Sequence, residues 1–129
     1  MSHRDPGADQ FGCAQCWPSS VEAAWAARAT LRRTACLIQQ SHWSVTLLTC
    51  AACAQGFLAI FTETIDWTDG DDPQYWTVMP VTPAEATALV QCTDALTEST
   101  VYALAPDRRV LQRDYPKGAA QPTLHRIKW

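Results

Sequence analysis

The chain has 129 residues and a formal net charge of −3, with 47% hydrophobic and 18% charged residues. This length suits a single domain, expected over residues 1–129, and the apolar share is sufficient for a core. The sequence has no apolar run near the roughly 20 residues that a membrane-spanning helix needs. Its polar N-terminus lacks the apolar segment of a secretory signal, so we expect a protein kept in the cytosol.

The charged residues are distributed unevenly along the chain. From Thr34 to Asp107 there is no Lys or Arg, and the charged side chains are all acidic: Glu63, Asp66, Asp69, Asp71, Asp72, Glu85, Asp94, Glu98 and Asp107. The basic residues lie outside this segment: Arg4, Arg28, Arg32, Arg33, Arg108, Arg109, Arg113, Lys117, Arg126 and Lys128. Such a pattern either steers a charged partner or is neutralised where the ends and the middle of the chain meet.

The first third of the chain predicts a loosely ordered N-terminal segment followed by a helix. Residues 1–12 are polar and contain Pro6 and Gly7, which favours a loosely ordered segment. Ser19 and Glu22 have the spacing of a capping box, so a helix is expected to begin near Ser20. Apolar residues at helical spacing continue as far as Ile38, and the pattern predicts a helix over residues 20–39.

A run of strands is expected next. Residues 42–49 alternate in polarity and are rich in strand formers, and residues 57–67 form a longer strand that is apolar on both faces near its start. Residues 68–73 have the composition of a turn, and residues 75–79 predict a third strand. Three strands joined by short turns form an antiparallel meander.

The last third predicts one more helix and three short strands. Thr82, Pro83 and Glu85 form a second helix start, with Ala86, Leu89, Val90 and Thr93 on the buried side and an end before Thr97. Residues 100–105 and 110–113 are expected to pair as strands, residues 115–122 to form a loop, and residues 124–129 a final strand. The expected fold class is α+β, an antiparallel β-meander with zinc-ribbon-like knuckles and two helices.

Two Cys-x-x-Cys pairs carry the clearest chemical signal: Cys13, Cys16, Cys50 and Cys53. Each tight turn offers two thiolates, and four thiolates make a closed tetrahedral shell suited to structural Zn²⁺. A closed shell leaves no position for substrate, which argues against metal-assisted catalysis. Iron in the same shell, a redox-active Cys-x-x-Cys pair and cysteines that are merely buried remain alternatives.

Residues 13–67 resemble the zinc-ribbon group, in which a first knuckle precedes an insertion and a second knuckle sits at the tip of a β-hairpin. The resemblance implies that Cys13, Cys16, Cys50 and Cys53 are metal ligands, and it implies nothing catalytic. Zinc knuckles of this group usually carry glycine just after the second cysteine, whereas this chain has Trp17 and Ala54 at those positions.

The remaining thiols and imidazoles are expected to be structural. Cys36 and Cys92 lie in apolar stretches, so both are predicted to be buried core residues. His42 precedes the second Cys pair closely enough to donate a hydrogen bond to a thiolate, although an ordinary histidine at a strand start is the simpler interpretation.

An acidic and aromatic hairpin is the candidate partner-binding surface. It comprises Glu63, Asp66, Trp67, Asp69, Asp71, Asp72, Tyr75 and Trp76. Aromatic residues beside charges are common interface anchors. The alternatives are a solvated turn, a Ca²⁺ or Mg²⁺ site, and aromatics that serve the core.

The sequence predicts binding and no enzymatic activity, because no nucleophile, base and oxyanion hole can be assembled from it. We expect a basic protein partner, with the chain acting as an inhibitor or immunity-type partner of a basic toxin or nuclease. Abundant alanine and an excess of arginine over lysine hint at a bacterial genome rich in GC. The alternatives are nucleic-acid binding through Arg28, Arg32 and Arg33 with Arg108 and Arg109, and a redox role.

Overall fold

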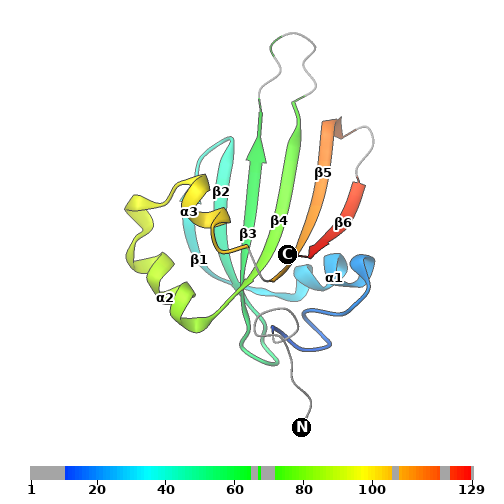
Figure 1. Ribbon diagram of the computed structural model, residues 1–129, viewed down its shortest axis with the longest axis vertical. Helices are drawn as coiled ribbons and strands as arrows, with labels where there is room; N and C mark the ends of the chain where they lie inside the picture. Colours follow the sequence, from blue (N-terminus) through cyan, green and yellow to red (C-terminus); the bar gives the residue numbers. More distant parts are fainter. Residues whose placement is uncertain (1–10, 65–66, 68–71, 106–107, 120–122, 129) are drawn as a thin grey trace.

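The computed structural model describes residues 11–64, 67, 72–105, 108–119 and 123–128, with side chains as far as residue 114. Its centre is one antiparallel sheet in which every strand pairs with its neighbours in the chain, in the order β1-β2-β3-β4-β5-β6 (Figure 1). The strands are β1 (Arg32–Gln39), β2 (Trp43–Thr49), β3 (Gly56–Glu63), β4 (Gln74–Val81), β5 (Arg109–Ala119) and β6 (Thr123–Lys128). The α+β class and the meander are therefore confirmed.

The helix expected over residues 20–39 is wrong in its second half. Helix α1 covers only Val21–Ala27, a 3₁₀ turn η1 follows at Arg28–Thr30, and β1 begins at Arg32. The N-cap is Ser20, whose hydroxyl accepts a hydrogen bond from the N–H of Ala23. Residues 32–39 are a strand because β2 supplies a pairing partner, and this tertiary pairing overrides a weak helical periodicity.

The helix after β4 has the predicted start. Helix α2 (Pro83–Gln91) has Thr82 as its N-cap, proline in the first turn and a complete capping box with Glu85. Of the predicted buried stripe, Leu89 is buried, whereas Val90 is 47% exposed and was wrongly placed. None of the helices in the described ranges is long and apolar enough to span a membrane.

The expected strand at 100–105 is a helix instead. A 3₁₀ turn η2 (Thr93–Ala95) leads into α3 (Glu98–Tyr102), which starts with a capping box between Thr97 and Thr100. That local cap decides the conformation, because the edge of β4 is already paired with β5. The loop expected at 115–122 is also wrong in part, since β5 continues to Ala119.

The sheet has a core on each face. On one face α2 and α3 cover residues of the central strands, a cluster that includes Leu47, Leu58, Met79, Leu89 and Val101. On the other face α1 and the first Cys pair pack on a second cluster that includes Trp17, Ala24, Phe57, Val78 and Leu111. Strand β3 is thus buried on both faces near the cysteines, as its sequence predicted. Each fully buried Phe or Leu of this strand contributes about 1.5–3 kcal/mol by leaving water.

Candidate metal centre

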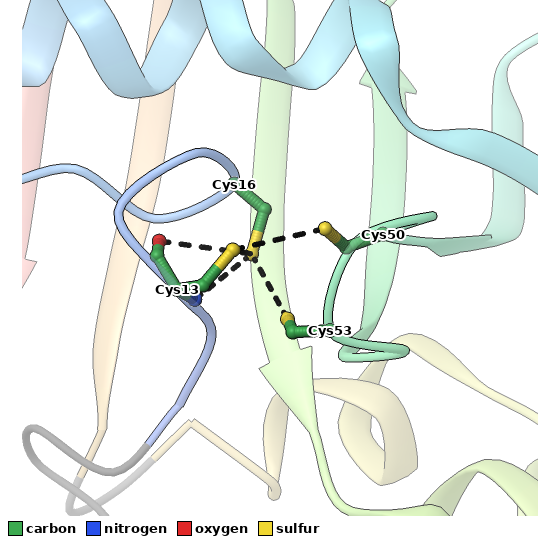
Figure 2. Close-up of side chains that lie close together, drawn as sticks. All are labelled: Cys13, Cys16, Cys50 and Cys53. Atoms are coloured by element: carbon green, nitrogen blue, oxygen red, sulfur yellow. Dashed lines mark hydrogen bonds between the residues drawn. The ribbon is translucent and has the colours of Figure 1, made fainter.

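The fold brings the two Cys pairs together. Figure 2 shows their side chains pointing toward a common centre, and all four sulfurs lie within 4.8 Å of one another. The Sγ of Cys16 is 3.7 Å from those of Cys13 and Cys53, and the Sγ of Cys13 is 3.9 Å from that of Cys50. A tetrahedral ion with Zn–S bonds of about 2.3 Å holds its sulfurs about 3.8 Å apart. The cluster therefore has the dimensions of a four-thiolate site and can hold a metal ion.

The first pair is held in a tight turn by the backbone and by Gly12. The N–H of Trp17 donates to the carbonyl of Cys13 at 2.8 Å, and the N–H of Cys13 points at the sulfur of Cys16 at 3.2 Å. Gly12 has φ +75°, and a Cβ there would come within 2.6 Å of the Cβ of Trp17. Trp17 itself is buried and its ring lies 5.2 Å from that of Phe57. This turn is therefore anchored in the second core cluster.

The second pair forms the turn between β2 and β3. The N–H of Ala54 donates to the carbonyl of Cys50 at 2.8 Å, and the N–H of Ala52 points at the sulfur of Cys50 at 3.3 Å. Ala54 has φ +68°, a left-handed conformation that an alanine adopts at a cost. The position that carries glycine in many zinc knuckles therefore has a glycine-like backbone here despite its methyl group.

We expect Ala54→Gly to raise the free energy of unfolding by up to about 1 kcal/mol, because glycine adopts the left-handed conformation without strain. Glycine also increases the entropy of the unfolded chain, which cancels only part of this gain. Urea denaturation of the metal-loaded protein checks it. Ala52→Gly is the matched control, since it lies in the same exposed turn without a positive φ and should lower stability slightly. A fall in stability for both variants would contradict the prediction.

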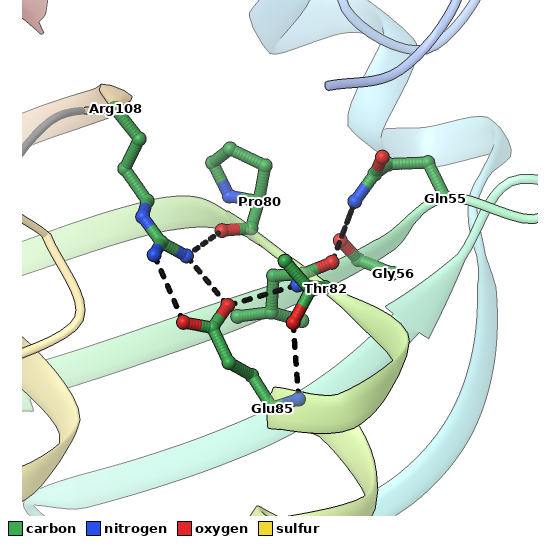
Figure 3. Close-up of polar contacts among 7 residues, drawn as sticks. Gln55, Gly56, Pro80, Thr82, Glu85 and Arg108 are labelled. Carbon is green, nitrogen blue, oxygen red and sulfur yellow. Dashed lines mark hydrogen bonds and ion pairs between the residues drawn. The ribbon is translucent and has the colours of Figure 1, made fainter. Parts of the chain in front are cut away.

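Gln55 joins the two halves of the site, and the sequence contained no signal for it. Its Oε1 accepts from the N–H of Gly12 at 3.0 Å, which ties the first turn to the second. Its Nε2 donates to the carbonyls of Gly56 at 2.9 Å and Val81 at 2.7 Å, and Figure 3 draws the amide beside Gly56. The cluster is thus connected to both β3 and β4.

The four thiols have unlike environments. Backbone N–H groups of Cys16 and Gln15 lower the pKa of the Cys13 thiol to about 7. Burial raises the pKa of Cys16 strongly, and burial also raises the pKa of Cys53. Close packing of four sulfurs disfavours several negative charges unless a cation sits among them, so metal binding must displace protons from this cluster.

The other two cysteines are not core residues, which corrects the prediction. Cys36 and Cys92 are both exposed. Cys36 lies on β1, an edge strand of the sheet, and Cys92 is the C-cap residue of α2. Their apolar sequence neighbours belong to elements whose other side faces the core, which sequence alone does not distinguish. Neither residue belongs to the metal cluster.

His42 lies away from the thiolates, at the opposite end of β2. Its Nδ1 is 3.0 Å from Oε1 of Glu63. Glu63 also accepts a hydrogen bond from Gln74 at 2.9 Å. The hydrogen bonds from Gln74 and His42 lower the pKa of the Glu63 carboxyl. His42 and Glu63 therefore brace the root of the β3–β4 hairpin, and the idea of a hydrogen bond from His42 to a thiolate is wrong.

The expected partner surface is described only in part. Trp67 is 90% exposed and Trp76 is 38% exposed, with the Trp76 ring 4.5 Å from that of Phe61. Tyr75, near the start of β4, and Asp72, just before this strand, are half-buried. The predictions for Asp66, Asp69 and Asp71 fall outside the described residues.

The arginines considered for nucleic acid do not form one patch. Arg108 binds Glu85 through both guanidinium nitrogens, at 2.8 and 2.9 Å, and donates to the carbonyl of Pro80 at 2.9 Å (Figure 3). Arg32 and Arg33 pair with neighbouring positions of β2, so their side chains lie on opposite faces of the sheet. The patch that the sequence suggested is therefore divided.

No protein-family model matches this chain, no curated protein is significantly similar to it, and no solved structure matches it significantly. What the fold and the site define is an α+β protein with a cluster of four cysteines that can hold a metal ion. The zinc-ribbon resemblance consequently rests on the cysteines alone.

Proposed function

We propose that the protein is a non-catalytic zinc-binding interaction module. Cys13, Cys16, Cys50 and Cys53 hold one structural Zn²⁺ in a zinc-ribbon-like arrangement, in which the ion joins the N-terminal segment to the β2–β3 turn. The observation that carries this assignment is that all four sulfurs lie within 4.8 Å of one another, with three of their separations at 3.7–3.9 Å. Thiolate ligands favour zinc over hard cations, and four of them leave no open coordination position.

The interaction surface is the acidic, aromatic hairpin between β3 and β4. Trp67 supports this because its side chain is 90% exposed and so buries almost none of its apolar surface in the fold. An exposed tryptophan is a typical anchor for a partner. The acidic residues around it in the sequence select a basic surface and speed its association. A cytosolic inhibitor or immunity-type protein, bound to a basic toxin or nuclease, is the function that this chemistry fits best.

The test is a pull-down with the metal-loaded protein as bait, using extract of the source cells at low and high salt. We expect one basic protein to be recovered at low salt and released at high salt, because charge steering is screened. Trp67→Ala should weaken this capture by about tenfold or more, the loss typical of an interface anchor.

Val90→Ala is the matched control, since Val90 is another exposed large apolar residue and lies on α2, away from the hairpin. It should leave the capture unchanged. Recovery that is insensitive to salt and equal for Trp67→Ala and the parent protein would contradict the proposed surface and leave the zinc centre untouched.

A further inference from the structure

A hollow of about 360 Å³ lies on the α1 face of the sheet, apart from the cysteine cluster. Helix α1 packs toward β5 and β6, so among the described elements no helix covers part of β2, β3 and β4 on this face (Figure 1). Trp25, Arg28 and Leu31 form the wall on the helix side, and the strands form the floor. The hollow is therefore a consequence of the short helix that ends at Ala27.

The floor of the hollow is made of small side chains beside an aromatic pair. Thr46, Ala59 and Val78 stand opposite one another in three neighbouring strands, and their small volume creates the depression. In the adjacent row Phe61 stacks obliquely on Trp76, with ring centroids 4.5 Å apart. An apolar ring that enters the hollow would thus meet the Phe61–Trp76 pair on the strands, with Trp25 and its arginine contacts at the helix side.

Among the residues whose side chains the structure describes, the charged groups that line the hollow are Arg28 and Arg33, and none is an Asp or Glu, although the whole chain carries a net charge of −3. The guanidinium of Arg28 lies 3.9 Å from the Trp25 ring centre, and that of Arg113 lies 5.1 Å from the same centre. These cation–π contacts hold the Trp25 ring in place, and the lining arginines Arg28 and Arg33 give the hollow a positive potential.

We propose that this hollow is a binding site for a small planar aromatic anion. Aromatic walls, a small-residue floor and arginines at the mouth are the complement of one flat ring system that carries a carboxylate or a similar group. Its volume is at the lower end for ligand sites, which restricts the ligand to one or two fused rings. Arg33, exposed on the edge strand β1, is the residue that meets the anionic group.

The test is isothermal titration of the metal-loaded protein with indole-3-acetate. The neutral amide indole-3-acetamide is the matched ligand control, because it keeps the ring and loses the charge. We expect saturable binding of the acid, with the amide at least about tenfold weaker, the loss of one charge-assisted hydrogen bond. Equal binding of acid and amide, or no heat at millimolar acid, would overturn the proposal.

Two variants locate the site. Arg33→Gln should weaken binding of indole-3-acetate by about tenfold, whereas Arg32→Gln, the adjacent arginine on the opposite face of β1, should leave it unchanged. Ala59→Leu should abolish binding by filling the floor, with circular dichroism to verify the fold. Equal weakening of indole-3-acetate binding by Arg32→Gln and Arg33→Gln would overturn the proposed site. A parent protein that retains a single-stranded oligonucleotide but does not bind indole-3-acetate would overturn it as well.

Discussion

Cys50→Ser should release the metal and lower the free energy of unfolding by more than about 3 kcal/mol, the largest effect expected in this protein. Freshly purified parent protein should contain about one zinc per chain by elemental analysis. The serine side chain is close to cysteine in shape, so the loss arises from the metal and its cross-link between the N-terminal segment and the β2–β3 turn. Urea denaturation with and without a chelator measures this loss of stability.

Cys36→Ser is the matched control for this experiment, because Cys36 is an exposed cysteine on β1, outside the cluster. It should change neither the zinc content nor the stability. A parent protein that is purified without metal, and whose unfolding is unaffected by a chelator, would disprove the zinc centre. Iron in place of zinc would keep the four-cysteine shell and disprove the choice of metal.

Glu85→Gln should lower the free energy of unfolding by about 2 kcal/mol at neutral pH, the second largest effect. Glu85 has two roles, because it closes the capping box of α2 and receives the paired hydrogen bonds of Arg108. The glutamine oxygen can still accept from the N–H of Thr82, so the capping box is kept, whereas the charge and the hydrogen bond from Nη2 of Arg108 to the second oxygen are lost. The side chains of Arg108 and Glu85 are only 13% and 24% exposed, which limits screening by solvent.

The same pair predicts how stability depends on pH. The hydrogen bonds from Arg108 lower the pKa of Glu85 below its usual value of about 4.5. A carboxyl with a lowered pKa stabilises the fold above the unfolded-state pKa, and this contribution is lost as the pH falls through the folded-state pKa. The stability difference between the parent protein and Glu85→Gln should therefore be constant above about pH 5.5 and shrink as the pH falls below 4.5.

Denaturation curves at a series of pH values measure this difference. Asp94→Asn, which removes an exposed carboxylate in η2, is the control and should cost less than about 0.5 kcal/mol at every pH. A difference between the parent protein and Glu85→Gln that stays constant down to pH 3 would show that the charge of Glu85 does not contribute to stability.

The elements that sequence reasoning predicted well are those with strong local signals. Helix α2 begins where Thr82, Pro83 and Glu85 predict it, and strands β2, β3 and β4 are where the sequence predicts strands. The strand predicted over residues 57–67 is too long, since β3 ends at Glu63 and neither Thr64 nor Trp67 belongs to a strand. Residues 32–39 were predicted as helix and form a strand, and residues 100–102, at the start of the strand predicted over 100–105, lie in α3, because both segments have mixed propensities. Their conformations depend on whether a neighbouring strand has a free edge. Strand β2 offers its edge to residues 32–39, which become β1, whereas β4 is already paired with β5 and offers none to α3.

The candidate metal ligands were predictable because two thiols on one turn are a local pattern with a specific chemical meaning. The residues that support them were not. Gln55 bridges Gly12 to the second turn, and Ala54 takes a left-handed conformation, through contacts that no spacing reveals. Exposure of Cys36 and Cys92 was also missed, since hydropathy does not show which side of an element faces the core.

The sequence by itself determined the ligand set of the candidate metal centre, the capped start of α2 and the central meander, because each depends on interactions between residues close along the chain. Only the tertiary structure decided that the four sulfurs meet, that Glu85 reaches Arg108, and that a short α1 leaves an aromatic, arginine-lined hollow on the sheet. These features depend on contacts between distant segments, whose burial and pairing energies exceed local preferences.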